Sequence, residues 1–249
     1  MHLKNVFVIL TAAAVATAFA EYETLNVFGS IGAGFGMGGT HYESLQLETS
    51  GTTVADKFFN YGSGFKLNVG CQWFLMENVA LQPSFSYSVG IPFKDEDITL
   101  TTTTTTTYRR HLFGLKLGVV PRFEVLDLID MYAGVGLGFF WNSRPFEISE
   151  VTEVAGTSVT QDTTGKITSK PSPGFFGLLG ADFPLNDAFT LFGEIGFEQI
   201  SFSLDKYVIK EPVGRTGYYS KDDTSNLDPQ KVPGSSFQIH VGVRYAVLR

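Results

Sequence analysis

The chain has 249 residues, of which 43% are hydrophobic and 17% are charged, and its formal net charge is -7. An acidic chain without clusters of Lys and Arg is poorly suited to binding nucleic acid. The length fits a single all-β domain. Cys71 is the one cysteine of the sequence, which excludes a disulfide within the chain.

The first 20 residues have the pattern of a secretory signal. Lys4 provides a positive charge, residues 6–16 form an apolar segment, and Ala18-Phe19-Ala20 fits a small-residue cleavage site. An uncleaved membrane anchor is the alternative, but a spanning helix needs about 20 apolar residues. We therefore expect a signal peptide over residues 1–20 and a single mature domain over residues 21–249.

Eight segments alternate apolar residues with small or polar ones, as β-strands do. In the first, Leu25, Val27 and Ile31 share one parity, whereas Gly32 and Gly34 share the other. The weakest of the eight is segment 175–183, which has apolar residues on both parities. The segments are 25–42, 65–73, 81–91, 113–119, 131–141, 175–183, 191–197 and 237–247.

The connections between these segments alternate in length. Three are short, at residues 76–78, 124–130 and 184–187, and each follows an even-numbered segment. The other four are long and polar, over residues 42–56, 94–107, 142–173 and 205–234. Turns on one side and loops on the other are typical of barrels that cross a membrane. We predict an eight-stranded antiparallel up-and-down transmembrane β-barrel.

The polar parity is predicted to face the inside of this barrel. It is rich in Gly and Ser, which suits the narrow interior of eight strands. It also carries charges of both signs in the middle of the segments, where they can pair inside but would be costly facing lipid. A soluble barrel would have the opposite arrangement. The predicted ion-pair network of the lumen comprises Lys66, Lys116, Arg122, Asp182, Glu194, Glu198, His240 and Arg244.

Two segments strengthen a family resemblance. Residues 192–197 read Phe-Gly-Glu-Ile-Gly-Phe, and residues 241–245 read Val-Gly-Val-Arg-Tyr. With the signal and the eight alternating segments, they resemble the small outer-membrane β-barrel superfamily, which includes the OmpA transmembrane domain and OmpW-type proteins. The resemblance implies an outer-membrane location, periplasmic termini, and outer-membrane lipids and the barrel assembly machinery as partners. The chain departs from the superfamily pattern in one respect. Such proteins commonly end on an aromatic residue, whereas Tyr245 lies four residues before the end.

Several motifs resemble binding or catalytic sites, but a strand pattern or ion pairing explains them more simply. Residues 34–39 match a dinucleotide-binding fingerprint, but here the glycines continue a strand pattern. Glu194 and Glu198 could act as an acid–base pair, although ion pairing with the interior cations is favoured. No cofactor or metal site is expected, because His41, His111 and His240 are far apart.

The function predicted from this pattern is structural or surface recognition, with a lumen plugged by side chains and ligands bound through the loops. Tyr207, Tyr218 and Tyr219 are candidate loop contacts, and the threonine run 101–107 is either a hairpin extension or a glycosylated or variable tract. One alternative is a narrow channel for small or hydrophobic solutes. Another is a lipid-modifying enzyme using His240, but no motif frames a nucleophile, so we do not predict an enzyme.

Overall fold

The computed structural model describes residues 24–48, 51–98, 101–126, 129–154, 157–212, 224–226 and 231–248. The predicted signal at residues 1–20 and the candidate contacts Tyr218 and Tyr219 lie outside these ranges. No helix in the described part of the chain is long and apolar enough to cross a membrane.

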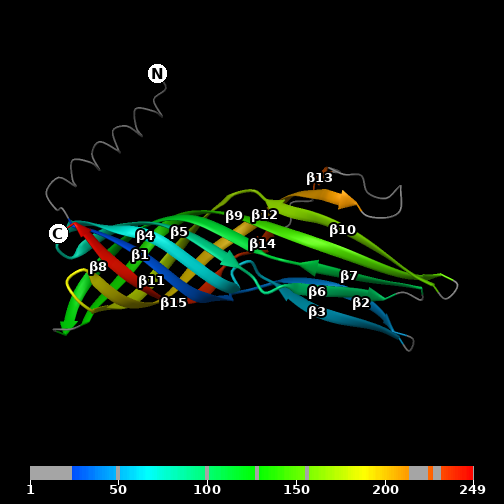
Figure 1. Cartoon of the computed structure of the whole chain (residues 1–249), viewed down its shortest axis with the longest axis horizontal. Helices are drawn as coiled ribbons and strands as arrows, with labels where there is room; N and C mark the ends of the chain where they lie inside the picture. The colour runs from blue at the N-terminus through cyan, green and yellow to red at the C-terminus, as the bar shows by residue number, and fades with distance from the viewer. Residues whose placement is uncertain are drawn as a thin grey trace, which may run out of the picture.

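Eight strands form a closed antiparallel barrel (Figure 1). Each pairs with the next, and β15 pairs with β1 to close the ring, so the predicted eight-stranded barrel is confirmed. The barrel strands are β1 (Leu25–Gly36), β4 (Gly64–Met76), β5 (Val79–Val89), β8 (His111–Leu126), β9 (Ile129–Val154), β11 (Ser172–Pro184), β12 (Phe189–Pro212) and β15 (Ser236–Leu248).

One end of the barrel carries the short turns, the start of β1 and the end of β15. Leu25 pairs with Leu248 on one side and with Trp73, near the β4–β5 turn, on the other. The three short connections join β4 to β5, β8 to β9 and β11 to β12, as predicted. We call this end the turn end.

The opposite end continues into a β-structure that we call the extension (Figure 1). Most of the residues predicted to lie in long loops form strands here, because paired backbone groups and β-branched side chains also stabilise sheets outside a membrane. β9 and β12 run on beyond the barrel, and β10 pairs with both. The additional strands are β2 (Thr40–Glu48), β3 (Gly51–Phe59), β6 (Phe93–Ile98), β7 (Thr102–Tyr108), β10 (Thr157–Ser169), β13 (Thr224–Asn226) and β14 (Lys231–Pro233).

The threonine run lies in the middle of the extension. β7 pairs with β6 on one side and with β9 on the other, so the run is an interior strand of the sheet. The Thr102 and Thr152 hydroxyls lie 3.3 Å apart across the β7–β9 pair. This placement agrees with the hairpin extension considered from the sequence.

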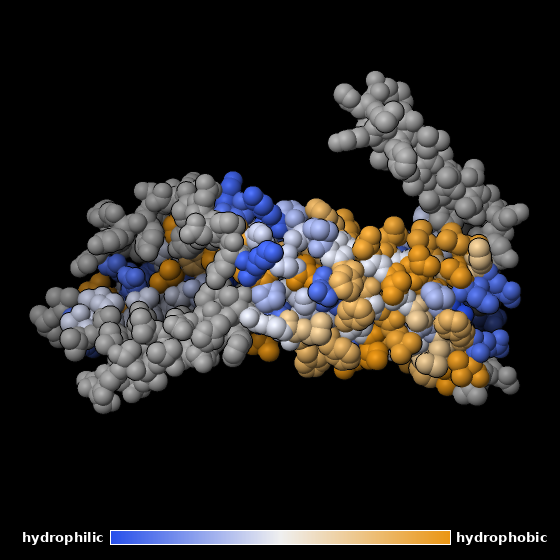
Figure 2. Space-filling model, turned by 180° about the vertical axis from the view of Figure 1, so that it is seen from behind, coloured by the Kyte–Doolittle hydropathy of each residue, from blue (hydrophilic) through white to orange (hydrophobic). Residues whose placement is uncertain are grey.

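The outer face of the barrel is apolar and the inner face is polar. Leu137 is 72% exposed on the outside, whereas Gln72 and His240 are almost completely buried inside. Figure 2 shows the apolar residues as a band across the visible face of the barrel, with hydrophilic residues at both ends of the band. The predicted assignment of the two parities is therefore confirmed.

Glycines on the inner face make room for a few large rings. An added Cβ at Gly180 would clash with the Tyr132 ring, and one at Gly242 would lie 2.6 Å from the Phe192 ring. On β11 the ring of Phe176 also points inward, with its centroid 5.3 Å from Lys116 Nζ. Inward apolar residues of this kind explain the apolar residues on both parities of segment 175–183.

Candidate functional site

The charged side chains of the lumen form two clusters. The first lies toward the turn end, where Asp182 on β11 accepts contacts from Arg122 on β8 and Arg244 on β15. The Arg244 guanidinium also lies over the Phe192 and Tyr132 rings, 4.1 and 4.4 Å from their centroids. A carboxylate shared by two guanidiniums and flanked by aromatic faces is a well-compensated buried charge.

The second cluster lies farther toward the extension. Glu198 on β12 accepts hydrogen bonds from Lys66 Nζ at 2.6 Å and Lys116 Nζ at 3.1 Å. Lys66 also donates to the Ser236 hydroxyl at 2.9 Å, and Lys116 to the Asn68 side-chain oxygen at 3.4 Å. These side chains come from four strands, so the cluster ties opposite parts of the wall together.

Glu194 and His240 lie between these clusters and contact neutral groups. The Tyr132 hydroxyl donates to Glu194 at 3.4 Å. His240 Nε2 lies 3.2 Å from the Gln238 side-chain oxygen, and the Asn68 amide nitrogen lies 3.4 Å from the same ring. The structure therefore places Glu194 and His240 in the lumen without bringing either into the ion pairs formed by Glu198 and Asp182.

The arrangement around His240 does not assemble a nucleophile. Ser235, which lies nearby in sequence, donates to the Ile200 carbonyl at 3.1 Å, and Ser236 is engaged by Lys66. A catalytic serine would instead need a hydrogen bond to the histidine that acts as its base. Among the described residues, no group of three His, Cys, Asp or Glu side chains is placed to hold a metal ion.

An apolar layer crosses the lumen where the barrel meets the extension. Tyr61 is 1% exposed and its ring packs edge-on against Phe202, with 5.6 Å between centroids. The segment that carries Tyr61 joins β3 to β4 and is fixed by hydrogen bonds of Asn60 to the carbonyls of Met37 and Gly38. The layer comprises Tyr61, Leu112, Phe140, Ile200, Phe202, Leu204 and Val232.

Sequence reasoning missed this apolar layer. Tyr61 lies on a connection between strands, where the two-residue period of a strand does not predict which way a side chain points. Phe202 lies between the predicted segment 191–197 and the predicted connection 205–234, and belongs to neither. The local signal is Gly62, directly after Tyr61, because a residue without a side chain lets the backbone approach the Gly234 and Ser235 carbonyls closely.

Little space is left around the described charged side chains of the lumen. An internal cavity beside Glu194, Lys116 and Gln82 has a volume of about 10 Å³. A vestibule of about 410 Å³ opens at the turn end, and Arg122 and Arg244 line it. The second charged cluster and the apolar layer lie beyond this vestibule along the barrel.

The pairing of β4 with β5 is interrupted at Pro83 on β5. The β4–β5 pairs run without a break from Phe65↔Val89 to Gly70↔Ser84 and resume at Trp73↔Leu81. Proline has no N–H and cannot donate to the ladder. On the inside, Gln72 donates to the Gln82 side-chain oxygen at 2.6 Å across the gap. On the outside, Cys71 and Pro83 line an apolar groove of about 750 Å³.

The predicted loop contacts are only partly covered by the structure. Tyr207 lies on β12 and pairs with Ile167 on β10 and Ser225 on β13, so its backbone belongs to the extension. Tyr218 and Tyr219 lie outside the described residues. The role of these three side chains remains a prediction.

A closed antiparallel barrel with an apolar outer belt and a polar inside is the architecture of an integral outer-membrane protein. The chain belongs to the outer membrane protein beta-barrel domain family, whose model matches residues 6–245. A comparison with curated protein sequences finds no significant match.

Several solved structures also match most of the chain. Neisserial surface protein A is 11% identical, with 89% of this chain and 96% of that chain covered and a TM-score of 0.43. OprG from Pseudomonas aeruginosa is 13% identical, with 90% and 95% covered and a TM-score of 0.47. Ail of Yersinia pestis is 13% identical, with 90% and 98% covered and a TM-score of 0.35.

Proposed function

We propose that this protein is a non-conducting outer-membrane barrel that acts through its extension, in a structural or surface-recognition role. The observation that carries the proposal is the internal cavity of about 10 Å³, which is scarcely enough for one water molecule. A hydrated pore needs continuous space along the barrel. The two charged clusters and the apolar layer around Tyr61 support a lumen plugged by side chains.

The proposed orientation places the turn end in the periplasm and the extension outside the cell. It is supported by the asymmetry of the connections, since outer-membrane barrels have short periplasmic turns and long external segments. Residues 1–20 would act as a cleaved signal, and the barrel assembly machinery would insert the chain. An external ligand would bind through the extension, where Tyr207, Tyr218 and Tyr219 are the candidate contacts.

Heat-modifiability and conductance together test this proposal. We expect the protein in outer-membrane fractions to migrate differently on a detergent gel before and after boiling, because a closed barrel resists unfolding in detergent. In planar bilayers the same purified protein should give no discrete conductance steps. A band without a heat shift would contradict the membrane barrel, and reproducible conductance steps would contradict the plugged lumen.

A second candidate function is the passage of small apolar solutes, and the gap at Pro83 is the observation that favours it. The outer groove of about 750 Å³ and the lumen side chains Gln72 and Gln82 lie on opposite faces of this gap. Pro83→Val would supply the missing N–H. If solutes cross the wall here, their uptake should fall in this variant, and unchanged uptake would exclude the route.

A further inference from the structure

An aromatic group covers the outer face of β5, β8 and β9 near the extension. The Trp141 ring stacks on Phe113, with 5.8 Å between centroids and 12° between planes. Tyr87 lies beside Phe113, with 5.1 Å between centroids. The Tyr87 hydroxyl and His111 Nδ1 are 2.8 Å apart. When Tyr87 donates to Nδ1, a neutral imidazole carries its proton on Nε2 and can donate it to a ligand.

Two cations lie next to this aromatic group, in the direction of the extension. The Arg109 backbone N–H donates to the Pro145 carbonyl at 2.9 Å, and Pro145 is in register with Lys166 on β10. Arg109 and Lys166 thus lie on either side of β9, separated by two strand spacings, or about 10 Å. Among the described residues neither of them takes part in an ion pair.

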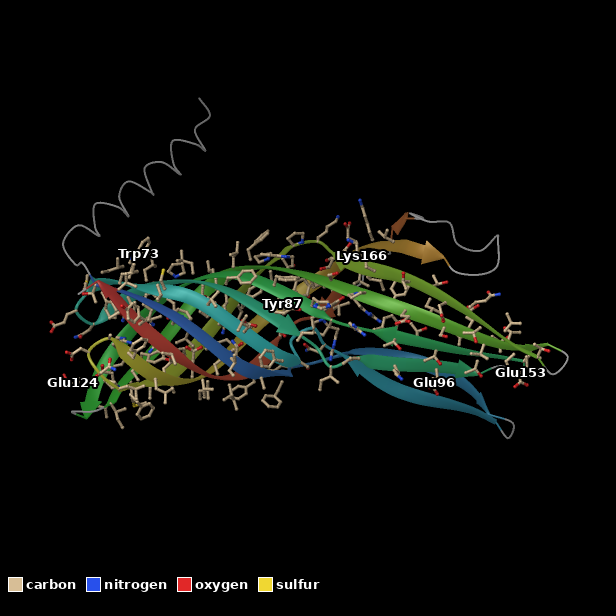
Figure 3. All side chains as sticks on the ribbon, viewed as in Figure 1. Trp73, Tyr87, Glu96, Glu124, Glu153 and Lys166 are labelled. Atoms are coloured by element: carbon tan, nitrogen blue, oxygen red, sulfur yellow. The ribbon has the colours of Figure 1, made fainter. Side chains whose placement is uncertain are left out.

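These side chains occupy the boundary between the apolar belt and the charged extension. On the side of the turn end, Leu115 is 55% exposed and Leu137 is 72% exposed. On the other side, Glu147 and Asp162 are exposed acids. Figure 3 shows Tyr87 and Lys166 between Trp73 at one end and Glu153 at the tip of the extension, with Lys166 pointing away from the barrel.

We propose that this surface binds a phosphorylated glycolipid of the outer leaflet. A phosphate group between Arg109 and Lys166 would accept charge-assisted hydrogen bonds, and His111 can add a further donor. The sugar rings would lie on the Trp141–Phe113 pair, since aromatic residues are favoured at the membrane interface. The inference rests on the orientation given under the proposed function, because the site must face the outer leaflet.

The charges at the turn end agree with this assignment. The side chains of Glu77, Glu124 and Asp187 are exposed there, and all three are acidic. Acidic residues repel lipid phosphates, whereas the boundary near the extension presents Arg109 and Lys166. If the inference holds, the boundary near the extension and not the turn end meets the phosphate-rich leaflet.

Binding can be followed with Trp141 as the reporter. The chain has two tryptophans, and Trp73 lies at the turn end, so Trp73→Phe leaves Trp141 as a single fluorophore at the site. In detergent micelles, titration with bisphosphorylated lipid A should change the Trp141 emission and saturate. In the Arg109→Ala/Lys166→Ala variant we expect an apparent Kd about thirtyfold higher, from two lost cation–phosphate contacts.

Matched controls separate this site from general charge attraction. Lys170 and Lys231 are exposed lysines that both lie beside Ser203, away from the Arg109–Lys166 pair, and their double replacement by alanine removes the same charge. This control variant should bind bisphosphorylated lipid A with the affinity of the parent protein. Lipid A without its phosphates should bind the parent protein as weakly as bisphosphorylated lipid A binds the Arg109/Lys166 variant. Absence of saturable binding, or equal affinity of the Arg109/Lys166 variant and the parent, would overturn the inference.

The orientation is tested separately on intact cells. In a Cys71→Ser background, Asp162→Cys on the extension should react with a membrane-impermeant maleimide. If labelling succeeds and phosphate-dependent binding is absent, the lipid site is wrong and the proposed orientation stands. If labelling fails on intact cells but succeeds after lysis, the orientation is wrong and the outer-leaflet assignment falls with it.

Discussion

Replacing Glu198 with glutamine tests whether the buried charges hold the barrel together. The carboxylate is 1% exposed, and it neutralises Lys66 and Lys116, which are 2% and 8% exposed. Breaking a buried ion pair by removing one partner costs about 3–5 kcal/mol, because the other charge stays buried without compensation. Here two ammonium groups lose their partner. Since glutamine still accepts one hydrogen bond, we expect Glu198→Gln to lower the free energy of unfolding by about 3 kcal/mol.

The assay is equilibrium unfolding by urea in phospholipid vesicles, followed by tryptophan fluorescence and analysed by linear extrapolation. Glu194→Gln is the matched control. Its carboxylate accepts a single long hydrogen bond from Tyr132 at 3.4 Å, so the expected loss is at most about 1 kcal/mol. Adding Lys66→Met to Glu198→Gln should restore part of the lost stability, because one unpaired cation is removed. A Glu198→Gln protein within about 0.5 kcal/mol of the parent would refute the reasoning.

Two further predictions concern the packing of the lumen. Gly180→Ala should destabilise the barrel by about 1–3 kcal/mol, because its Cβ would clash with Tyr132. In the same unfolding assay, Gly29→Ala should be neutral or slightly stabilising, since an added Cβ there meets nothing within 4 Å. A similar effect of the two variants would contradict the packing argument. Tyr61→Ala should open a cavity in the apolar layer beside Phe202 and increase conductance in planar bilayers. If the Tyr61→Ala variant gives no more conductance than the parent protein, Tyr61 is not required to keep the lumen closed.

The sequence determined the architecture of the wall. Alternation with a period of two residues is a local property of a strand, and it distinguished Leu25, Val27 and Ile31 on the outside from Gly32 and Gly34 on the inside. The short turns followed from the spacing of the apolar segments. The inner location of Lys66, Glu198 and Arg244 followed from their parity, because a mid-strand charge is costly in lipid.

Only the tertiary structure decided which of the inward residues meet. Lys66 and Glu198 are 132 residues apart in the chain, and their hydrogen bond depends on the registers of several strand pairs that close the ring. Tyr61 reaches the lumen from a connection, where no period applies. The extension also formed strands from residues too polar to give an apolar alternation. A local pattern gives the direction of a side chain, whereas closure of the barrel selects its partner.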